Sequence, residues 1–259
     1  MTVETSAAYL YCIVRSAARP SVARAPRGVP GGAKPEPHRV GPSLWLITAA
    51  VPLEIYGPDA LEPRLKDLDW VSRAALAHEA IVEHFSGARG TTVIPMKLFT
   101  MFSTVERAVA DVEARRDTIA RALRRIAGAE EWGVRVVRRQ PVRSAARVTK
   151  AATGAEFLRS RKQARDAVAD AREAIAAAAD RAFGSLRRLA RDARVRDARR
   201  EPGTNPPVLD AAFLVASRSR SRFKTEARRQ ARALAASGAD LVLSGPWPAY
   251  NFVAGGDSA

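Results

Sequence analysis

The sequence predicts an α+β protein of two lobes, each a small mixed or antiparallel sheet packed with helices. Three observations support this fold class. Apolar residues make up 47% of the chain, strand-like and helix-like segments alternate, and their order is ββαβα followed by βαβαβ. We place the division near residue 130, with an N-terminal α+β domain over 1–130 and a C-terminal ferredoxin-like α+β domain over 131–259. A chain of 259 residues can bury two cores of ordinary size.

The first lobe is expected to begin with two strands separated by an insertion. Tyr9–Val14 is a compact β-prone run, and residues 44–49 form a second one. Between them, residues 16–43 contain six prolines and four glycines. Because this stretch is rich in backbone-breaking residues and lacks a periodic apolar pattern, we expect it to form a mobile surface loop.

Two helices and one extended segment complete the first lobe. Asp69 can cap a helix that runs to about Phe85, and residues 92–99 are extended, with Pro95 marking an edge or a bulge. A Ser-x-x-Glu capping box at 103–106 begins a second helix, which ends near Ala127. The first helix has apolar residues at three- and four-residue spacing: Trp70, Ala74, Ala77, Ile81 and Phe85.

The second lobe alternates strands with helical segments. Strands are expected over 132–137, 209–215 and 240–244, and helical segments over 154–197 and 221–236. An unbroken helix over 154–197 would be about 65 Å long, which exceeds the size of a small domain. We therefore expect that long helical region to break near 183–185.

The charge of the chain is strongly positive, at +16, and almost all of the basic residues are arginine. Such a surface attracts polyanions or acidic partner proteins, although a preference for GC-rich codons gives the same arginine excess. Acids interleaved at helical spacing in 154–197 are typical of a solvated helix face with ion pairs. The arginine-rich residues after Phe183 lack aromatic platforms for stacked bases. These features argue against a basic nucleic-acid-binding protein, which is the alternative function.

Sequence motifs give no sign of a catalytic centre, a cofactor site or a metal site. Cys12 is the single cysteine, so neither a disulfide framework nor a thiolate metal site is expected. His78 and His84 are six residues apart, whereas a helical zinc pair needs a spacing of four; we expect His78 to make a polar contact beneath the sheet. Residues 28–32 carry prolines where a phosphate-binding loop would have to begin its helix. The chain is therefore predicted not to be an enzyme.

The sequence gives no obvious sign of a secretory signal or a membrane span. Residues 1–4 lack a basic leader followed by an apolar stretch, and the longest uncharged apolar run, residues 44–53, is about half a membrane span. We expect a cytoplasmic protein without a membrane span.

The most unusual segment is the C-terminal run Gly245–Val253, which follows the apolar residues 241–243. Its prolines stiffen the backbone, so that its aromatic side chains are held on a short rigid arm. Such an arm either docks on the protein's own body or presents apolar surface to a partner, and we favour docking. The candidate structural or partner-contact residues of this C-terminal arm are Pro246, Trp247, Pro248, Tyr250 and Phe252.

Five segments, taken in order, resemble the GvpL/GvpF family of gas vesicle accessory proteins. They are Tyr9–Val14, Leu68–Glu79, Gly90–Lys97, Gly154–Leu158 and Gly245–Phe252. The chain departs from the commoner family pattern at Leu98-Phe99-Thr100, where Phe-Gly-Thr is usual, and at Ala249, where a further proline is frequent.

The resemblance implies a non-enzymatic accessory protein for the formation of gas vesicles, the protein shells that give microbes buoyancy. Family members are thought to bind the small hydrophobic shell protein and other accessory proteins during nucleation or assembly. The resemblance further implies a cytoplasmic location with association to the gas vesicle, either during assembly or in the finished particle.

Overall fold

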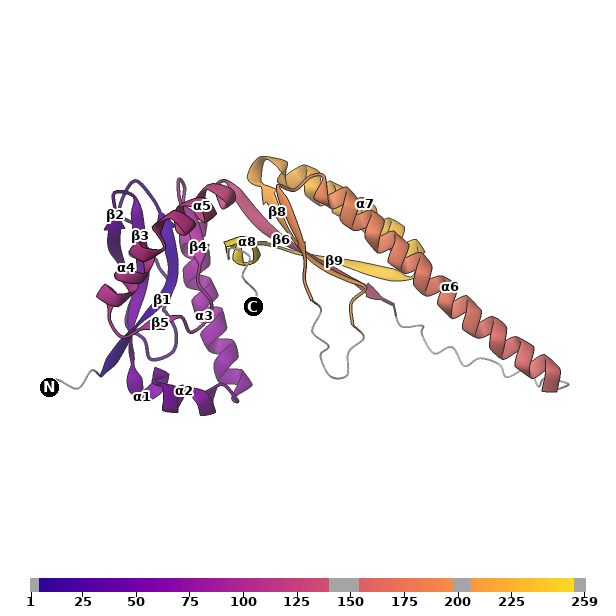
Figure 1. The fold of residues 1–259 in the computed structure, drawn as a ribbon, viewed down its shortest axis with the longest axis horizontal. Coiled ribbons are helices and arrows are strands. Elements are labelled where there is room, and N and C mark those ends of the chain that lie inside the picture. The colour runs from indigo at the N-terminus through magenta and orange to yellow at the C-terminus, as the bar shows by residue number, and fades with distance from the viewer. Residues whose placement is uncertain (1–4, 140–153, 198–205, 254–259) are drawn as a thin grey trace. The chain divides into compact units, whose positions relative to one another are not determined.

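The computed structural model describes residues 5–139, 154–197 and 206–253 and divides into two compact units (Figure 1). Unit 1 comprises Met1–Glu130 and Trp247–Ala259, and unit 2 comprises Glu131–Pro246. The second lobe was expected to include all of residues 131–259. The structure differs because the chain returns to unit 1 at Trp247, where the short helix α8 (Tyr250–Val253) packs against other elements of that unit.

Unit 1 is built on one antiparallel sheet, in which the strand order is β2-β3-β1-β4 and β5 pairs with β1 beside β4. The strands are β1 (Ser6–Arg15), β2 (Glu36–Gly41), β3 (Leu44–Pro52), β4 (Thr92–Pro95) and β5 (Met101–Phe102). Every residue of β1 from Ala8 to Val14 is buried. The central strand is therefore covered on both faces, which explains why its sequence is an unbroken apolar run.

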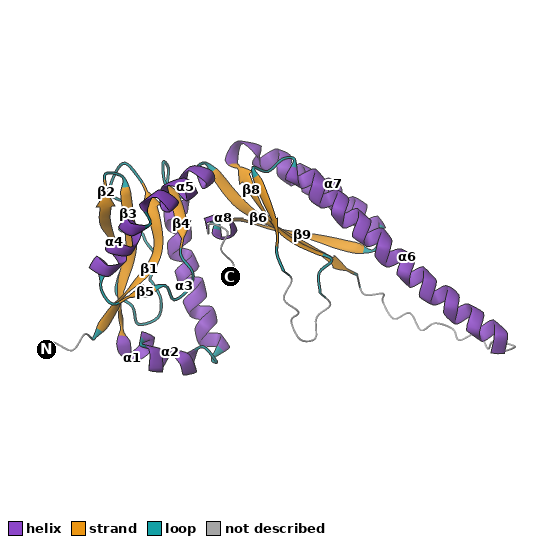
Figure 2. Ribbon diagram, in the orientation of Figure 1, coloured by secondary structure: helices purple, strands orange, loops and turns teal. Residues whose placement is uncertain are grey.

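Helices cover this sheet, as the colouring in Figure 2 shows. They are α1 (Leu53–Tyr56), α2 (Pro58–Arg64), α3 (Leu68–Ser86), α4 (Val105–Ala114) and α5 (Arg116–Ile126). Trp70, Ile81 and Phe85 of α3 belong to the same core cluster as Tyr9 and Tyr11 of β1. The period of three and four residues therefore predicted the buried side of α3.

The helix starts in unit 1 differ in detail from the sequence prediction. The cap of α3 is Asp67 instead of Asp69, and its carboxylate accepts hydrogen bonds from the N–H groups of Asp69 and Trp70. The cap of α4 is Thr104, whose hydroxyl accepts from the N–H of Arg107. The single helix predicted from the capping box to Ala127 is two helices, because Arg115 leaves the helical conformation between them.

The loop predicted over 16–43 is shorter in the structure, because residues 36–41 form β2, and the residues before β2 make specific contacts with the core of unit 1. Val29 is buried, and its N–H donates to Tyr11 Oη at 2.9 Å. Tyr56 Oη donates to the carbonyl of Pro30 at 2.7 Å. A side chain at Gly28 would collide with Tyr11 Oη. In this segment the prolines and glycines stabilise one close-packed conformation, although the same residues usually interrupt regular secondary structure.

Unit 2 has the β-α-β-β-α-β order of the ferredoxin-like fold, with the strand order β7-β8-β6-β9. Its elements are β6 (Ala129–Arg138), α6 (Gly154–Arg187), β7 (Asp192–Val195), β8 (Leu209–Ala216), the short 3-10 turn η1 (Ser217–Ser219), α7 (Arg220–Ala236) and β9 (Ala239–Trp247). Together with the sheet of unit 1, this arrangement confirms the α+β class.

The long helical region 154–197 is shorter than predicted, since α6 ends at Arg187 and residues 192–195 form β7. The predicted break at 183–185 is also wrong, because α6 continues through these residues. Residues 155–174 of α6 are exposed, and burial against the unit's core begins at Ile175. The helix needs no break because its first half extends past the strands (Figure 1).

Candidate interaction surface

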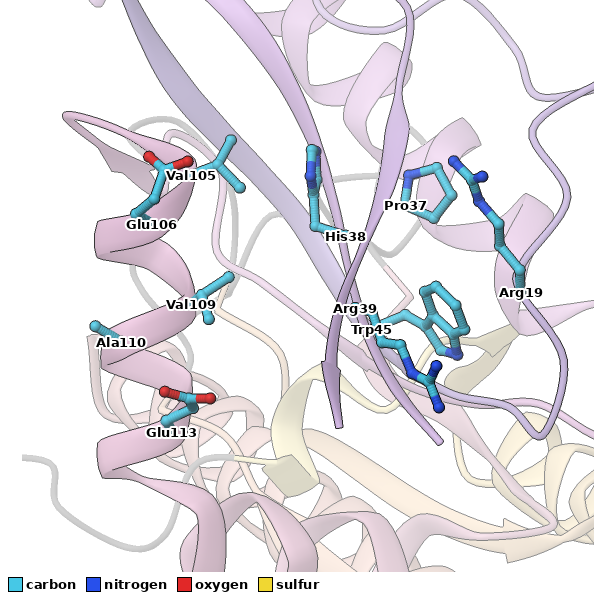
Figure 3. A pocket seen from close by; sticks show the side chains of 10 residues that line it. All are labelled: Arg19, Pro37, His38, Arg39, Trp45, Val105, Glu106, Val109, Ala110 and Glu113. Atoms are coloured by element: carbon cyan, nitrogen blue, oxygen red, sulfur yellow. The ribbon is translucent and has the colours of Figure 1, made fainter. Parts of the chain in front are cut away.

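A groove in unit 1 runs beside β2, between this edge strand and α4. The middle of the groove is a recess of about 590 Å³, shown in Figure 3. Neighbouring hollows continue it at both ends. One shares His38 and Val105 with the recess, and the other shares Glu113 and extends to Leu44 and Leu123. We call the whole feature the β2 groove.

One side of the β2 groove faces α4. Successive outward turns of α4 contribute Val105 and Val109 as apolar wall, and Glu106 and Glu113 as carboxylates (Figure 3). His38 lines this side of the groove from β2 (Figure 3). Two hydrogen bonds to the Glu106 carboxylate lower the pKa of Glu106 below its ordinary value. The larger effect comes from the backbone N–H of Glu106 and the smaller one from the Thr104 hydroxyl. This side therefore offers apolar contact and negative charge.

The other side of the same recess carries the opposite charge. The Arg39 guanidinium lies 5.8 Å from the centroid of the Trp45 ring, and Arg39 Nε donates to the carbonyl of Gly41 at 3.1 Å. Arg19 and Pro37 complete this side (Figure 3). No carboxylate among the described residues forms an ion pair with Arg19 or Arg39. Both positive charges are thus available to an outside ligand.

The C-terminal arm lies elsewhere in unit 1, where α8 contacts α5 and β4. Phe252 is 1% exposed and Pro248 is buried, whereas Pro246 is exposed and Trp247 is 41% exposed. Tyr250 Oη donates to Glu79 Oε2 at 2.6 Å. Burial and then the Glu79 carboxylate raise the pKa of Tyr250 above its ordinary value. None of these five arm residues lines the β2 groove.

His78 makes the polar contact that its position suggested. Its Nδ1 lies 2.9 Å from Tyr9 Oη, and its Nε2 lies 3.1 Å from the carbonyl of Met96. Burial lowers the pKa of His78 to about 4. In the ranges 5–139, 154–197 and 206–253 no three metal-binding side chains gather, and no helix there is long and apolar enough to cross a membrane.

Sequence reasoning missed the β2 groove because it treated β2 as part of a loop. A usable signal was present: the two residues Pro42 and Ser43 separate residues 36–41 from the apolar run that begins at Leu44. Two extended runs joined by two turn-forming residues are typical of a β-hairpin. Reading that hairpin would have placed His38 and Arg39 on an edge strand.

Comparisons with known proteins agree with one another. A family model described as "Gas vesicle synthesis protein GvpL/GvpF" matches residues 7–254. The chain is 33% identical over 232 residues to gas vesicle protein L of Streptomyces sp. (strain CB03234), an alignment that covers 86% of this chain and 84% of that protein. The crystal structure of GvpF from Anabaena sp. PCC7120 is similar with a TM-score of 0.69 at 15% identity, covering 98% of each chain. GvpF from Microcystis aeruginosa gives 0.63 at 14% identity, covering 96% of this chain and 99% of that one.

Proposed function

The chain belongs to the GvpL/GvpF family of gas vesicle synthesis proteins, and from this premise we propose that it is a non-enzymatic accessory protein of gas vesicle formation. In this proposal it binds the small hydrophobic shell protein and other accessory proteins during nucleation or assembly. It acts in the cytoplasm, in association with the growing or finished vesicle. The observation that carries the proposal is the family match over almost the whole chain, residues 7–254.

Physical chemistry supports a binding role of this kind. A shell subunit with an apolar side must be shielded before it assembles, since large exposed apolar patches aggregate. The β2 groove offers apolar wall from Val105 and Val109 beside an edge strand, with charged residues around it. Grooves of this type receive either an amphipathic helix or an added strand. A binding protein needs nothing more than such a surface.

The test is a pull-down of purified shell protein by the full chain, together with deletion of the gene from a vesicle-forming host. We expect retention of the shell protein, and absent or stunted vesicles after deletion. Normal vesicle yield in the deletion strain would refute the proposal. Failure to retain the shell protein, combined with tight and steeply salt-dependent binding to duplex DNA, would favour the nucleic-acid alternative instead.

A further inference from the structure

Helices contact both edge strands of the unit 1 sheet, β4 through α5 and α8, and β2 through α4. The β2 edge is the one that borders the recess of Figure 3. β2 pairs with β3 on one side only, and no described strand pairs with its outer side. An open edge presents unpaired backbone groups, which are a template for another strand.

The backbone of β2 indicates which groups face outward. Pro37 has no N–H to give to β3, and within sheets proline places its nitrogen on the free side of an edge strand. In the register of the two strands, Pro37 lies opposite Ile47 and Arg39 lies opposite Trp45. Pro37 and Arg39 are two positions apart and therefore have the same orientation toward β3. Since orientation alternates along a strand, the Arg39 N–H and the carbonyls of Pro37 and Arg39 point away from β3.

The recess of Figure 3 extends over both sides of this edge. A strand added to β2 would send alternate side chains to opposite sides of the sheet. On one side they would meet Arg19, Arg39 and the rim of Trp45, and on the other Val109 and Glu113. This distribution of charge favours an added strand with acidic side chains on one side and apolar or basic side chains on the other.

We propose that β2 binds an extended segment of a partner protein by strand addition, with the acidic side chains of that segment facing Arg19 and Arg39. The segment's other face carries apolar or basic side chains toward Val109 and Glu113. This inference rests on the proposed function, because it describes how a gas vesicle protein would engage the chain. Pro37 and the irregularity between Arg39 and Gly41 shorten the edge and discourage unselective pairing, so that charge decides which segment binds.

The first experiment compares two blocked, fluorescently labelled peptides of one composition. The matched peptide is Glu-Val-Glu-Lys-Glu-Val, in which acids alternate with valine and lysine. The control peptide is Glu-Glu-Glu-Lys-Val-Val, which has the same charge without the alternation. Because the chain carries a net charge of +16, equal net charge is essential to remove general attraction. We expect the matched peptide to bind the full chain about tenfold more tightly by fluorescence anisotropy, and equal affinities would overturn the proposal.

Substitutions then locate the binding. Arg39→Ala removes the charge and the side-chain contacts with Trp45 and Gly41 but keeps the outward N–H, whereas Arg39→Pro removes the N–H as well. We expect Arg39→Pro to abolish the preference for the matched peptide and Arg39→Ala to weaken binding by several-fold. Arg19→Glu combined with Arg39→Glu should reduce matched-peptide binding by more than tenfold. Arg73→Glu combined with Arg89→Glu, at two exposed positions that do not line the recess, is the control for the same change in net charge. Melting temperatures identify any variant that fails to fold, and the double charge reversal then decides the question.

The shell-protein pull-down separates this inference from the proposed function. If the wild-type chain retains the shell protein and folded Arg39→Pro retains it equally, strand addition is wrong and the proposed function stands. If the wild-type chain retains no shell protein, the part of the proposed function that concerns shell-protein binding is wrong. The peptide comparison still decides the role of the β2 edge in that case.

Discussion

Phe99 offers a test of whether backbone strain or side-chain packing dominates at one unusual position. Its φ of 62° lies in the left-handed region, where side chains other than glycine are uncommon. The family resemblance described above implies glycine at this position. The Phe99 ring stacks on Trp70 with centroids 5.6 Å apart and ring planes inclined by 8°. At Phe99 a strained backbone conformation is therefore combined with a stabilising contact between the Phe99 and Trp70 rings.

The two effects can be separated with two substitutions. Phe99→Ala removes the ring and keeps the strain, while Phe99→Gly removes both. A left-handed residue other than glycine costs about 1–2 kcal/mol, and glycine loses about 0.5–1 kcal/mol more conformational entropy on folding than alanine. Because Phe99 is half-buried, loss of its ring should cost about 2 kcal/mol, less than the 3–5 kcal/mol of a fully buried ring. We expect Phe99→Ala to be destabilised by about 2 kcal/mol, and Phe99→Gly by up to about 1 kcal/mol less.

Urea unfolding of the two variants and the wild-type chain measures these free energies. The matched control is the pair Lys97→Ala and Lys97→Gly, at an exposed position whose φ is not positive. There the order should be the usual one, with the alanine variant more stable. If the difference in stability between the alanine and glycine variants is the same at position 99 as at position 97, the left-handed strain does not operate as argued.

Three further outcomes are expected. Phe252→Ala should lower the free energy of unfolding by about 3–5 kcal/mol, and Trp247→Ala by less than about 1 kcal/mol, since only Phe252 is fully buried; equal losses in calorimetry would contradict this order. The pKa of about 4 that burial gives folded His78 lies below its ordinary 6.5. As pH falls, His78 therefore gains its proton in the unfolded chain before it does so in the folded chain. The free energy of unfolding is highest above pH 6.5 and falls by up to about 3 kcal/mol between pH 6.5 and 4. His78→Gln should flatten this part of the curve. Asp210 is buried against two arginine side chains, so Asp210→Ala should destabilise the chain by about 1–3 kcal/mol in urea unfolding, more than Asp240→Ala at an exposed ion pair.

The sequence predicted those elements whose own pattern determines their burial. The side of α3 that packs inward follows from apolar residues every three or four positions, and Trp70, Ala74, Ile81 and Phe85 are buried. Ala77 of the same predicted row is only half-buried. The core strands β1 and β8 were visible as short continuous apolar runs. In each case local periodicity and burial carry the same information.

Two short edge strands, β2 and β7, were not predicted, for a physical reason. A strand paired on one side has little buried surface, so its residues need not be apolar or alternate clearly. β2 carries Pro37 and Arg39, and β7 lies within an arginine-rich stretch that resembles the end of a helix. The length of α6 was not predicted for a different reason. No local sequence pattern indicates whether a polar helix ends at the sheet or continues past it.

The C-terminal arm and the β2 groove show why the candidate site could not be reached from local patterns alone. The arm's aromatic residues suggested two alternatives, docking on the protein or contact with a partner. In the structure these residues differ, because Phe252 is buried beside Tyr250 on unit 1 while Trp247 stays 41% exposed. The β2 groove combines residues from 5–19, 33–50 and 103–124, which come together only when the sheet forms. If docking of the arm secures the β4 side while β2 stays open, Phe252→Ala should weaken stability without changing the preference of β2 for the matched peptide. A variant that remains folded but loses that preference would show that the two sides of unit 1 are coupled.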